Sequence, residues 1–264
     1  RMLRSITLKT VFEKRWSMLA WFVGLFLTTV VIMLLFPTLR DTLGKALNEV
    51  PESMKGILGN AQTYQRVNGF IDIQVLAQMV FMTIVYGIIL FTGVIAGDEN
   101  DGTLQTLLAN PVSRTRVYFE KLAGASLLLF IVNSSIFFGT WIGALIVSES
   151  VDLVKLATAC FMLFVVTFVF SAIGFCIGSV TGKRGLAGAL AGTLAFVSYL
   201  ITNLVPSVKI LRSVDRFSPY EYFNKPSILD NGVEFKDLLI LVSISLFFVV
   251  LGYVVFTKRD LSHK

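Results

Sequence analysis

Charge is what this sequence has least of. Asp, Glu, Lys and Arg make up 15% of the 264 residues and apolar residues 55%, whereas soluble domains carry about 25% charged residues. This shortage excludes an ordinary soluble domain. The net charge of +6 does not indicate nucleic acid either, because the basic residues are scattered and form no single basic patch.

Side chains suited to catalysis or metal binding are also scarce. The one histidine, His263, lies in the C-terminal tail, and the two cysteines, Cys160 and Cys176, lie in one apolar stretch, where they are expected to pack as small apolar residues. No HExxH motif or His/Cys cluster is present. Ser171 and Ser198 have no base nearby in the sequence to activate them. We therefore expect no catalytic residue, no metal ligand and no cofactor in this chain.

Long uncharged stretches dominate what remains. A bilayer core about 30 Å thick needs roughly 20 apolar residues per helix. Six stretches are long enough: 16–36, 73–96, 122–148, 156–181, 186–206 and 238–257. They lack the alternation of a transmembrane β-barrel, and the first is too long for a signal peptide. The sequence predicts an all-α integral membrane protein with six transmembrane helices, forming a single transmembrane domain over residues 1–264.

The flanking charges predict the orientation. Six spans place both termini on one side, and basic pairs border the first span (Lys14, Arg15) and the last (Lys258, Arg259). By the positive-inside rule both termini are expected to be cytoplasmic. We expect a multi-pass protein of the cell membrane, plasma or inner.

Residues 178–184 (Gly-Ser-Val-Thr-Gly-Lys-Arg) are superficially similar to a phosphate-binding P-loop. That motif needs four residues between its glycines and Ser or Thr after the lysine, and neither condition is met. The stretch is expected to form a tight turn between spans 4 and 5. The chain is not expected to bind ATP itself.

Small and polar residues within the spans have two possible roles each. Glycines recur four residues apart at Gly139/Gly143, Gly174/Gly178/Gly182 and Gly188/Gly192, a spacing that allows close helix packing or serves as a hinge. Asn133, Ser134 and Ser135 form a polar notch in span 3. This notch either makes hydrogen bonds between helices or lines a substrate path.

The loop between spans 2 and 3 is predicted to hold a short helix. Asp101 is placed to cap its N-terminus, and neighbouring acidic residues suit the positive end of the helix. Leu104, Leu107 and Leu108 form an apolar stripe. The proline at position 111 ends the helix, and the serine at 113 can cap the next one. A helix lying on the lipid surface would show the same pattern.

The same loop carries a recognisable run of residues. It reads Glu99, Gly102-Thr103-Leu104, Leu107-Leu108 and Pro111-Val112-Ser113-Arg114. This run resembles the loop between spans 2 and 3 in the permease subunits of ABC transporters of the type-2, exporter-like class. Residues 217–223 are similar to that family's Ser-Pro-Phe-x-Tyr-Phe segment, with Tyr220 where Phe is commoner, and residues 256–261 to its C-terminal end.

The resemblance implies a function. Two permease chains, identical or homologous, would pair in the lipid, and each would dock on a cytoplasmic ATPase subunit that holds ATP and Mg. The loop helix would couple the two proteins, with its three leucines anchored in a groove of the ATPase, while Arg114 and Arg116 pair with acidic residues or lipid phosphates. Residues 1–15 would form an interfacial elbow helix. The coupling residues expected on this basis are Glu99, Gly102, Thr103, Leu104, Leu107, Leu108, Pro111, Ser113 and Arg114.

The segment before the last span is expected to lie in the outer leaflet as a short helix or re-entrant hairpin. Its aromatic residues are typical of a membrane interface. They are Phe217, Tyr220, Tyr222 and Phe223, with Pro219 among them. A simple outer loop is the alternative.

Two other functions stay open at this stage. A channel or secondary transporter would show inverted repeats or midplane charges, and none is apparent. A membrane scaffold or assembly protein would lack an ATPase partner. An exporter permease is the leading hypothesis.

Overall fold

The computed structural model describes residues 5–49, 66–109, 111–204, 218–223 and 228–259. All regular structure in these ranges is helical. The elements are α1 (Ile6–Leu34), α2 (Phe36–Glu49), α5 (Val67–Phe70), η1 (Ile71–Leu76), α6 (Ala77–Thr92), η2 (Gly93–Gly97), α7 (Asp98–Asn100), α8 (Thr103–Leu108), α9 (Arg114–Ile146), α10 (Leu153–Thr181), α11 (Arg184–Leu204), α13 (Ile228–Asn231) and α14 (Phe235–Lys258). The elements η1 and η2 are π-helical turns that flank α6.

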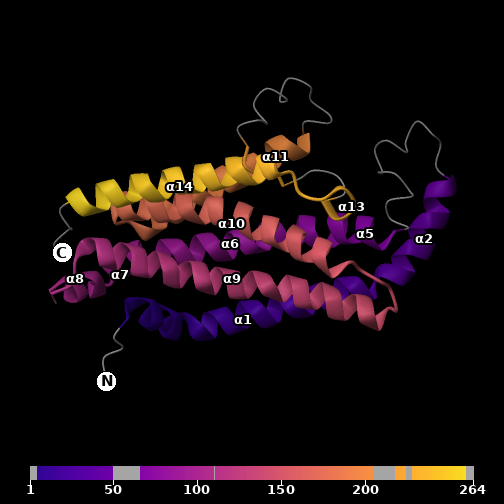
Figure 1. Cartoon of the computed structure of the whole chain (residues 1–264), viewed down its shortest axis with the longest axis horizontal. Coiled ribbons are helices and arrows are strands. Elements are labelled where there is room, and N and C mark those ends of the chain that lie inside the picture. The colour runs from indigo at the N-terminus through magenta and orange to yellow at the C-terminus, as the bar shows by residue number, and fades with distance from the viewer. Residues whose placement is uncertain (1–4, 50–65, 110, 205–217, 224–227, 260–264) are drawn as a thin grey trace.

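Six helical stretches are long and apolar enough to cross a membrane. They are Ile6–Thr42, Val67–Asn100, Arg114–Ile146, Leu153–Thr181, Arg184–Thr202 and Phe235–Lys258. The predicted all-α membrane fold with six spans is confirmed. The helices lie side by side in an elongated bundle (Figure 1), with the start of α1, the end of α14 and the pair α7–α8 at one end, and α2 and α5 at the other.

The first span differs from the prediction. Residues 6–34 form one unbroken helix, so the expected separate elbow helix at residues 1–15 is wrong for the described part of that segment. No proline or glycine interrupts the sequence before Gly24, and nothing else breaks the helix. The chain then continues through Leu35 into α2, beyond the predicted end of the first span at residue 36.

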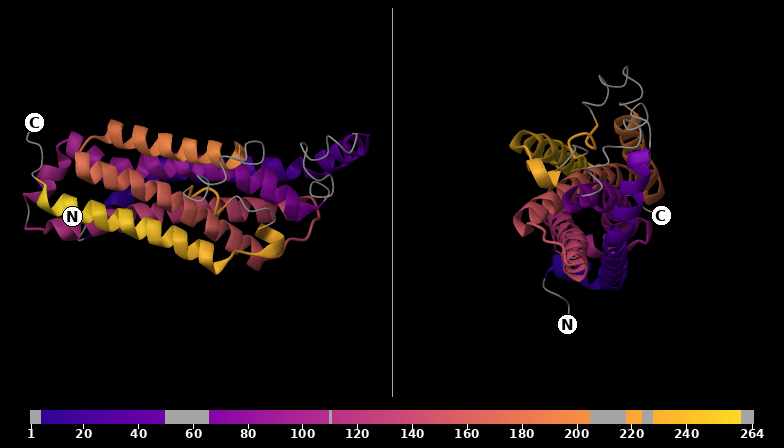
Figure 2. Two further views of the ribbon diagram at one scale, coloured as in Figure 1. Left: turned by 90° about the horizontal axis from the view of Figure 1, so that it is seen from above. Right: turned by 90° about the vertical axis from the view of Figure 1, so that its right-hand side faces the viewer.

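Helix α10 is the centre of the bundle. It packs against α14, α6, α11 and α9, and the end-on view shows α1 on one side of the bundle with α11 and α14 on the other (Figure 2). An α-helix that is apolar all round suits this position because every face meets another helix. Helices α1 and α14, in contrast, bury little of their surface within the chain.

Glycines allow a close approach between α1 and α9. A Cβ added at Gly139 would lie 3.0 Å from the carbonyl oxygen of Phe26, and one at Gly143 would meet Met33 Cβ at 2.5 Å. The Gly174/Gly178 pair likewise packs against neighbouring helices, whereas Gly188 faces open space. The packing interpretation of the glycine spacing holds for the first two groups.

Enlarging Gly139 tests this contact. The Gly139→Leu variant is expected to lose about 1–3 kcal/mol of stability because α1 must move away from α9, lowering the thermal unfolding midpoint in detergent. The Gly188→Leu variant adds the same side chain where nothing lies within 4 Å, and its midpoint should stay unchanged. Equal midpoints for the two variants would contradict the close packing.

Candidate functional site

The loop between spans 2 and 3 contains one short helix, α8, as predicted, while α7 is the last turn of the helical stretch Val67–Asn100. Helices α7 and α8 are separated by a reversal at Gly102, whose φ of 72° is left-handed and favours glycine. Asp101 ends α7 and makes no side-chain cap on α8. The predicted Asp101 cap is therefore wrong, because the left-handed residue intervenes between Asp101 and α8.

The leucine stripe of α8 faces its own chain. Leu104 is fully buried, and Leu107 and Leu108 are half-buried against the core. The exposed surface of this segment is formed by Thr103, Thr106 and Ala109. The expectation that Leu104 reaches a groove in another protein is therefore wrong for this structure, since its side chain already fixes α8 to the bundle.

The turn after α8 agrees with the sequence. Helix α8 ends at Leu108, before the exposed Pro111. Ser113 caps α9, since its Oγ accepts from the Arg116 backbone N–H at 3.2 Å. The start of α9 is thus fixed next to α8.

Two adjacent acidic residues of α7 form ion pairs in different directions. Asp98 pairs with Lys121 of α9, and Glu99 pairs with Arg259 at the end of α14. The side chains of Lys121 and Glu99 are each only 4% exposed. These acidic residues were expected to lie at the N-terminus of the loop helix and interact with its dipole. They instead form ion pairs that bind α7 to two spans.

Arg114 strengthens the link to α14. Its Nη1 donates to the carbonyl oxygens of Arg259 at 2.5 Å and Thr257 at 3.4 Å. The arginine is therefore bonded within the chain through Nη1. Sequence reasoning could not find these partners, since they lie more than 140 positions away.

Gly182 packs against the Glu99–Arg259 pair. It ends α10 with a φ of 65°, and a Cβ added there would lie 2.6 Å from Glu99 Oε1 and 2.7 Å from Arg259 Nη1. The turn between α10 and α11 therefore belongs to the same site. We name Glu99, Arg114, Gly182 and Arg259 the α7–α14 cluster.

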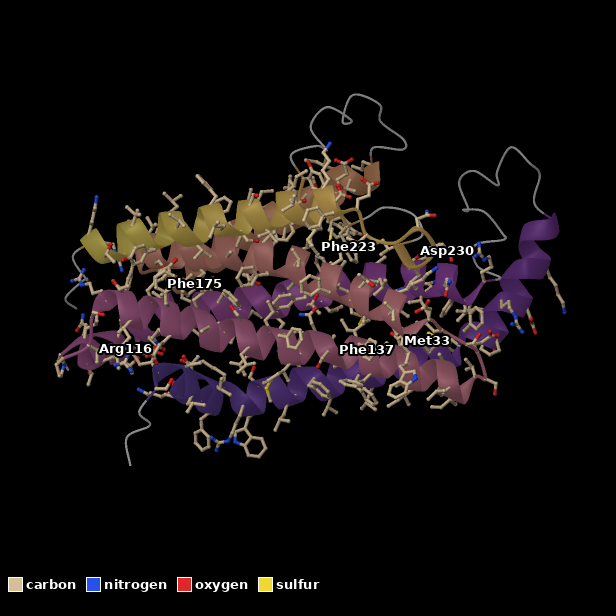
Figure 3. The ribbon with its side chains drawn as sticks, in the orientation of Figure 1. Met33, Arg116, Phe137, Phe175, Phe223 and Asp230 are labelled. Carbon is tan, nitrogen blue, oxygen red and sulfur yellow. The ribbon has the colours of Figure 1, made fainter. Side chains whose placement is uncertain are left out.

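Glu120 performs a related role for α1. Its carboxylate pairs with Arg116 at 2.6 Å and accepts from the backbone N–H groups of Ile6 and Thr7 at 2.5 and 3.2 Å. The bond from Arg116, labelled in Figure 3, and then these N–H groups lower the pKa of Glu120 despite its partial burial. The start of α1 is held on α9 next to α8.

The opposite end of the bundle carries a second polar group that the sequence did not indicate. Asp230 of α13 accepts from Asn68 Nδ2 at 2.9 Å and pairs with Arg66, and the Leu229 N–H donates to Asp72 at 3.4 Å (Figure 3). These bonds hold α13 on α5 and η1. The only signal in the sequence was the presence of polar residues next to two spans.

The aromatic segment before the last span packs inside the protein. Tyr220 and Phe223 are buried, and Ser218 Oγ lies 2.5 Å from Ser198 Oγ of α11 and 3.0 Å from Thr202 Oγ1. Pro219 and Tyr222 are half-buried. Phe217 and the helical spacing before it lie outside the described residues. Two of the rings therefore contact protein, where the membrane interface was expected.

The polar notch in α9 makes no hydrogen bond to another helix within the described ranges. Asn133, Ser134 and Ser135 each donate to a carbonyl oxygen of α9 itself, at 2.6–3.1 Å. Asn133 and Ser134 also line a groove of about 450 Å³ between α9 and α10, whose other walls are mainly phenylalanines such as Phe137 (Figure 3).

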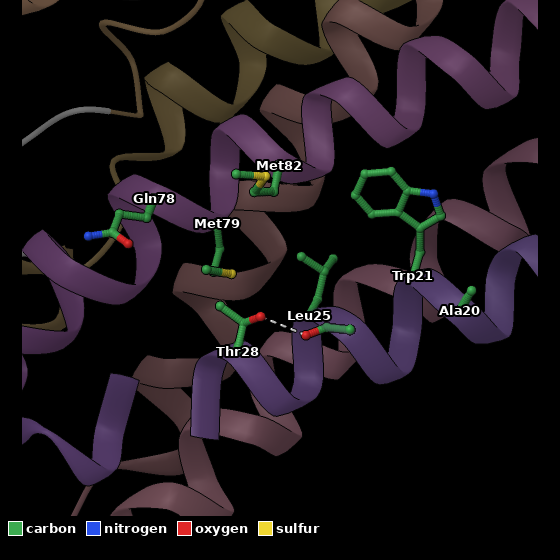
Figure 4. A pocket seen from close by; sticks show the side chains of 8 residues that line it. Ala20, Trp21, Leu25, Thr28, Gln78, Met79 and Met82 are labelled. Carbon is green, nitrogen blue, oxygen red and sulfur yellow. Dashed lines mark hydrogen bonds between the residues drawn. The ribbon is translucent and has the colours of Figure 1, made fainter. Parts of the chain in front are cut away.

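A second groove, of about 390 Å³, lies between α1 and α6. Trp21 and Leu25 line it from α1, and Met79 and Met82 from α6, as Figure 4 shows. Thr28 Oγ1 bonds back to the Gly24 carbonyl oxygen at 2.8 Å. Both grooves are apolar. Within the described ranges, no three His, Cys, Asp or Glu side chains could jointly hold a metal ion.

Comparison with known families agrees with this architecture. The model of a family described as "ABC-2 family transporter protein" matches residues 6–261, nearly the whole chain. The chain belongs to the ABC-2 transporter family. No curated protein matches it. ABC-2 permeases are the membrane subunits of transporters and are not themselves catalytic.

Replacing Gly182 tests how tightly the turn sits on the ion pair. Gly182→Ala and Gly232→Ala both place Ala at a positive φ, 65° and 79°, but only Gly182 has neighbours within 4 Å. Both variants should lose about 1 kcal/mol from backbone strain, and Gly182→Ala should lose clearly more in thermal unfolding. Equal losses would show that the turn is not packed on the pair.

Protonation of Glu120 should release the start of α1. Because its folded pKa lies below the ordinary 4.5, its stabilising effect is present above 4.5 and is lost as the pH falls through the folded value. Glu120→Gln should therefore lower the unfolding midpoint at pH 7, and the difference from the unaltered chain should close at acidic pH. Glu13→Gln, which removes an exposed pair with Lys9, should change little at either pH.

Proposed function

We propose that this ABC-2 permease couples ATP hydrolysis by a separate ATPase subunit to substrate movement, as an exporter. The observation that carries the proposal is the construction of α8: a short helix with an exposed polar side whose buried side is fixed to the spans. The complex would contain two ATPase subunits, which hold ATP and Mg, and a second permease chain, identical or homologous.

The exposed side of α8 supports docking of a partner protein. Thr103, Thr106 and Ala109 are exposed and recur at intervals of three, so they lie on one side of the segment. The opposite side is fixed by Leu104, which is fully buried. A rigid, surface-presented helix can be received by a groove in another protein, and displacement of α8 would then act directly on the bundle.

The proposed orientation in the membrane rests on the end of the bundle that carries α8. The described ends of α1 and α14 and the pair α7–α8 lie together (Figure 1), and basic residues such as Lys14, Arg15 and Lys258 lie at this end. The positive-inside rule supports a cytoplasmic position for it in the cell membrane. A cytoplasmic ATPase would then meet α8.

The lining of the grooves supports an apolar cargo. Both grooves are walled mainly by aromatic, methionine and leucine side chains, and Asn133 and Ser134 add polar groups to the one between α9 and α10. A lipid, a peptide or a hydrophobic drug fits these walls better than an ion does, since an ion would need charged or carbonyl-lined surroundings. The substrate path through the polar notch would lie in the groove between α9 and α10.

A charge on the exposed side of α8 tests the docking. In affinity-tagged chain purified from its host's membranes, Ala109→Arg should abolish co-purification of an ATPase and the associated Mg-dependent ATP hydrolysis. Since Ala109 is exposed, the thermal stability of the chain should stay unchanged.

Ser150→Arg provides the control, because Ser150 is exposed at the other end of the bundle. It should keep both the ATPase and its activity. Full retention of the ATPase by Ala109→Arg would refute docking at α8. Absence of any ATPase in the unaltered preparation would favour a channel or a scaffold.

A further inference from the structure

The α7–α14 cluster links the loop to the last span at a point where several segments converge. We propose that Glu99 and Arg259 form a latch that carries displacement of α8 to α14 and to the α10–α11 turn. They are positioning residues, and the inference rests on the proposed function of α8 as the docking helix.

Both flanks of α8 hold the same residue. Glu99, three residues before the reversal at Gly102, binds the guanidinium of Arg259, and Arg114, at the start of α9, binds the Arg259 carbonyl oxygen at 2.5 Å. Arg259 directly follows α14. A force on α8 is therefore applied to the end of α14 from both sides of the loop.

Burial makes this link strong. The Glu99 side chain is 4% exposed and that of Arg259 18% exposed, so neither charge is well solvated. Removing one member of a buried pair leaves an uncompensated charge, which is strongly unfavourable. The two segments should consequently move together.

The Glu99–Arg259 pair could also form a further hydrogen bond. Glu99 Oε1 and Arg259 Nε are buried without a hydrogen-bond partner within the described structure. Arginine and carboxylate often pair through two parallel bonds, and a rotation of the guanidinium would allow Nε to reach Oε1. This rotation would give the latch a second arrangement, and a transmitting element requires two.

The surroundings of the latch determine what it moves. Gly182 lies directly against both charged groups, so the turn that joins α10 to α11 follows their position. Helix α14 packs mainly on α10 and exposes most of its other faces. A displacement of its end would therefore be passed mainly to α10.

Hydrogen exchange of the chain alone tests the physical link. Glu99→Gln and Arg259→Gln should each raise amide exchange about tenfold or more in both α8 and the last turn of α14, because the loss of one buried charge releases both segments. Double charge reversal, Glu99→Arg with Arg259→Glu, should restore much of the protection.

Arg40→Gln is the matched control. It breaks another Arg–Glu pair, Arg40–Glu149 at 3.0 Å, at the end of the bundle opposite α8. It should leave exchange in α8 and α14 unchanged. If Glu99→Gln accelerates exchange in α8 alone, the latch is refuted. This experiment needs no ATPase, so its result is independent of the proposed function.

Transmission is tested in the complex with its ATPase. Spin labels at Val154 and Phe235, which are 77% and 71% exposed at the starts of α10 and α14, report the relative position of these helices; the native Cys160 and Cys176 are buried. Adding a non-hydrolysable ATP analogue with Mg should shift the label distance in the unaltered chain and in Arg40→Gln. The shift should vanish in Glu99→Gln and return in the double reversal.

A shift that persists in Glu99→Gln would overturn transmission through the latch. So would a double reversal that recovers assembly and the protection of both segments without recovering the shift. Failure of the proposed function would look different: no ATPase would accompany the unaltered chain, while the exchange experiment would still confirm or refute the latch.

Discussion

Lipid offers the backbone no hydrogen-bond partner, and the rest of this structure depends on that constraint. An N–H or C=O group in the hydrocarbon must be bonded within the protein, and a helix achieves this within one segment. The same constraint acts on side chains. Ser135, Ser171 and Ser245 each bond to a carbonyl oxygen of their own helix. Other polar side chains bond between helices: Thr83 of α6 lies 3.0 Å from Thr167 of α10, and the Tyr118 hydroxyl of α9 donates to the Val249 carbonyl oxygen of α14 at 2.7 Å.

Charged residues can then act only where the spans end, and there they determine which segments belong together. Asp98 and Glu99 connect α7 to two different spans, and Glu120 fixes the start of α1. On the other side, Asp230 fixes α13. Charge therefore holds the ends of the bundle, while its middle is held by apolar packing and a few hydrogen bonds between helices.

The sequence allowed the spans to be predicted but not their partners. Apolar length alone locates a transmembrane helix, and the cap at Ser113 is readable because it is local. The elbow helix was wrong because an amphipathic cluster looks the same whether it lies on a membrane or continues a span. Burial of Leu104 and the pairing of Glu99 with Arg259 depend on which helices are neighbours. A single sequence does not contain that information.

The length of α9 has a consequence for the membrane itself. Its 33 residues rise about 50 Å, well beyond a hydrocarbon core of about 30 Å. The stretch from Arg114 to Lys121 contributes about 12 Å of this length, and it supports α7 and α8. By this length α8 would lie beyond the acyl chains, in the headgroup layer or the water. Bilayer thickness thus sets how far α8 protrudes, and a thicker membrane would draw it towards the lipid.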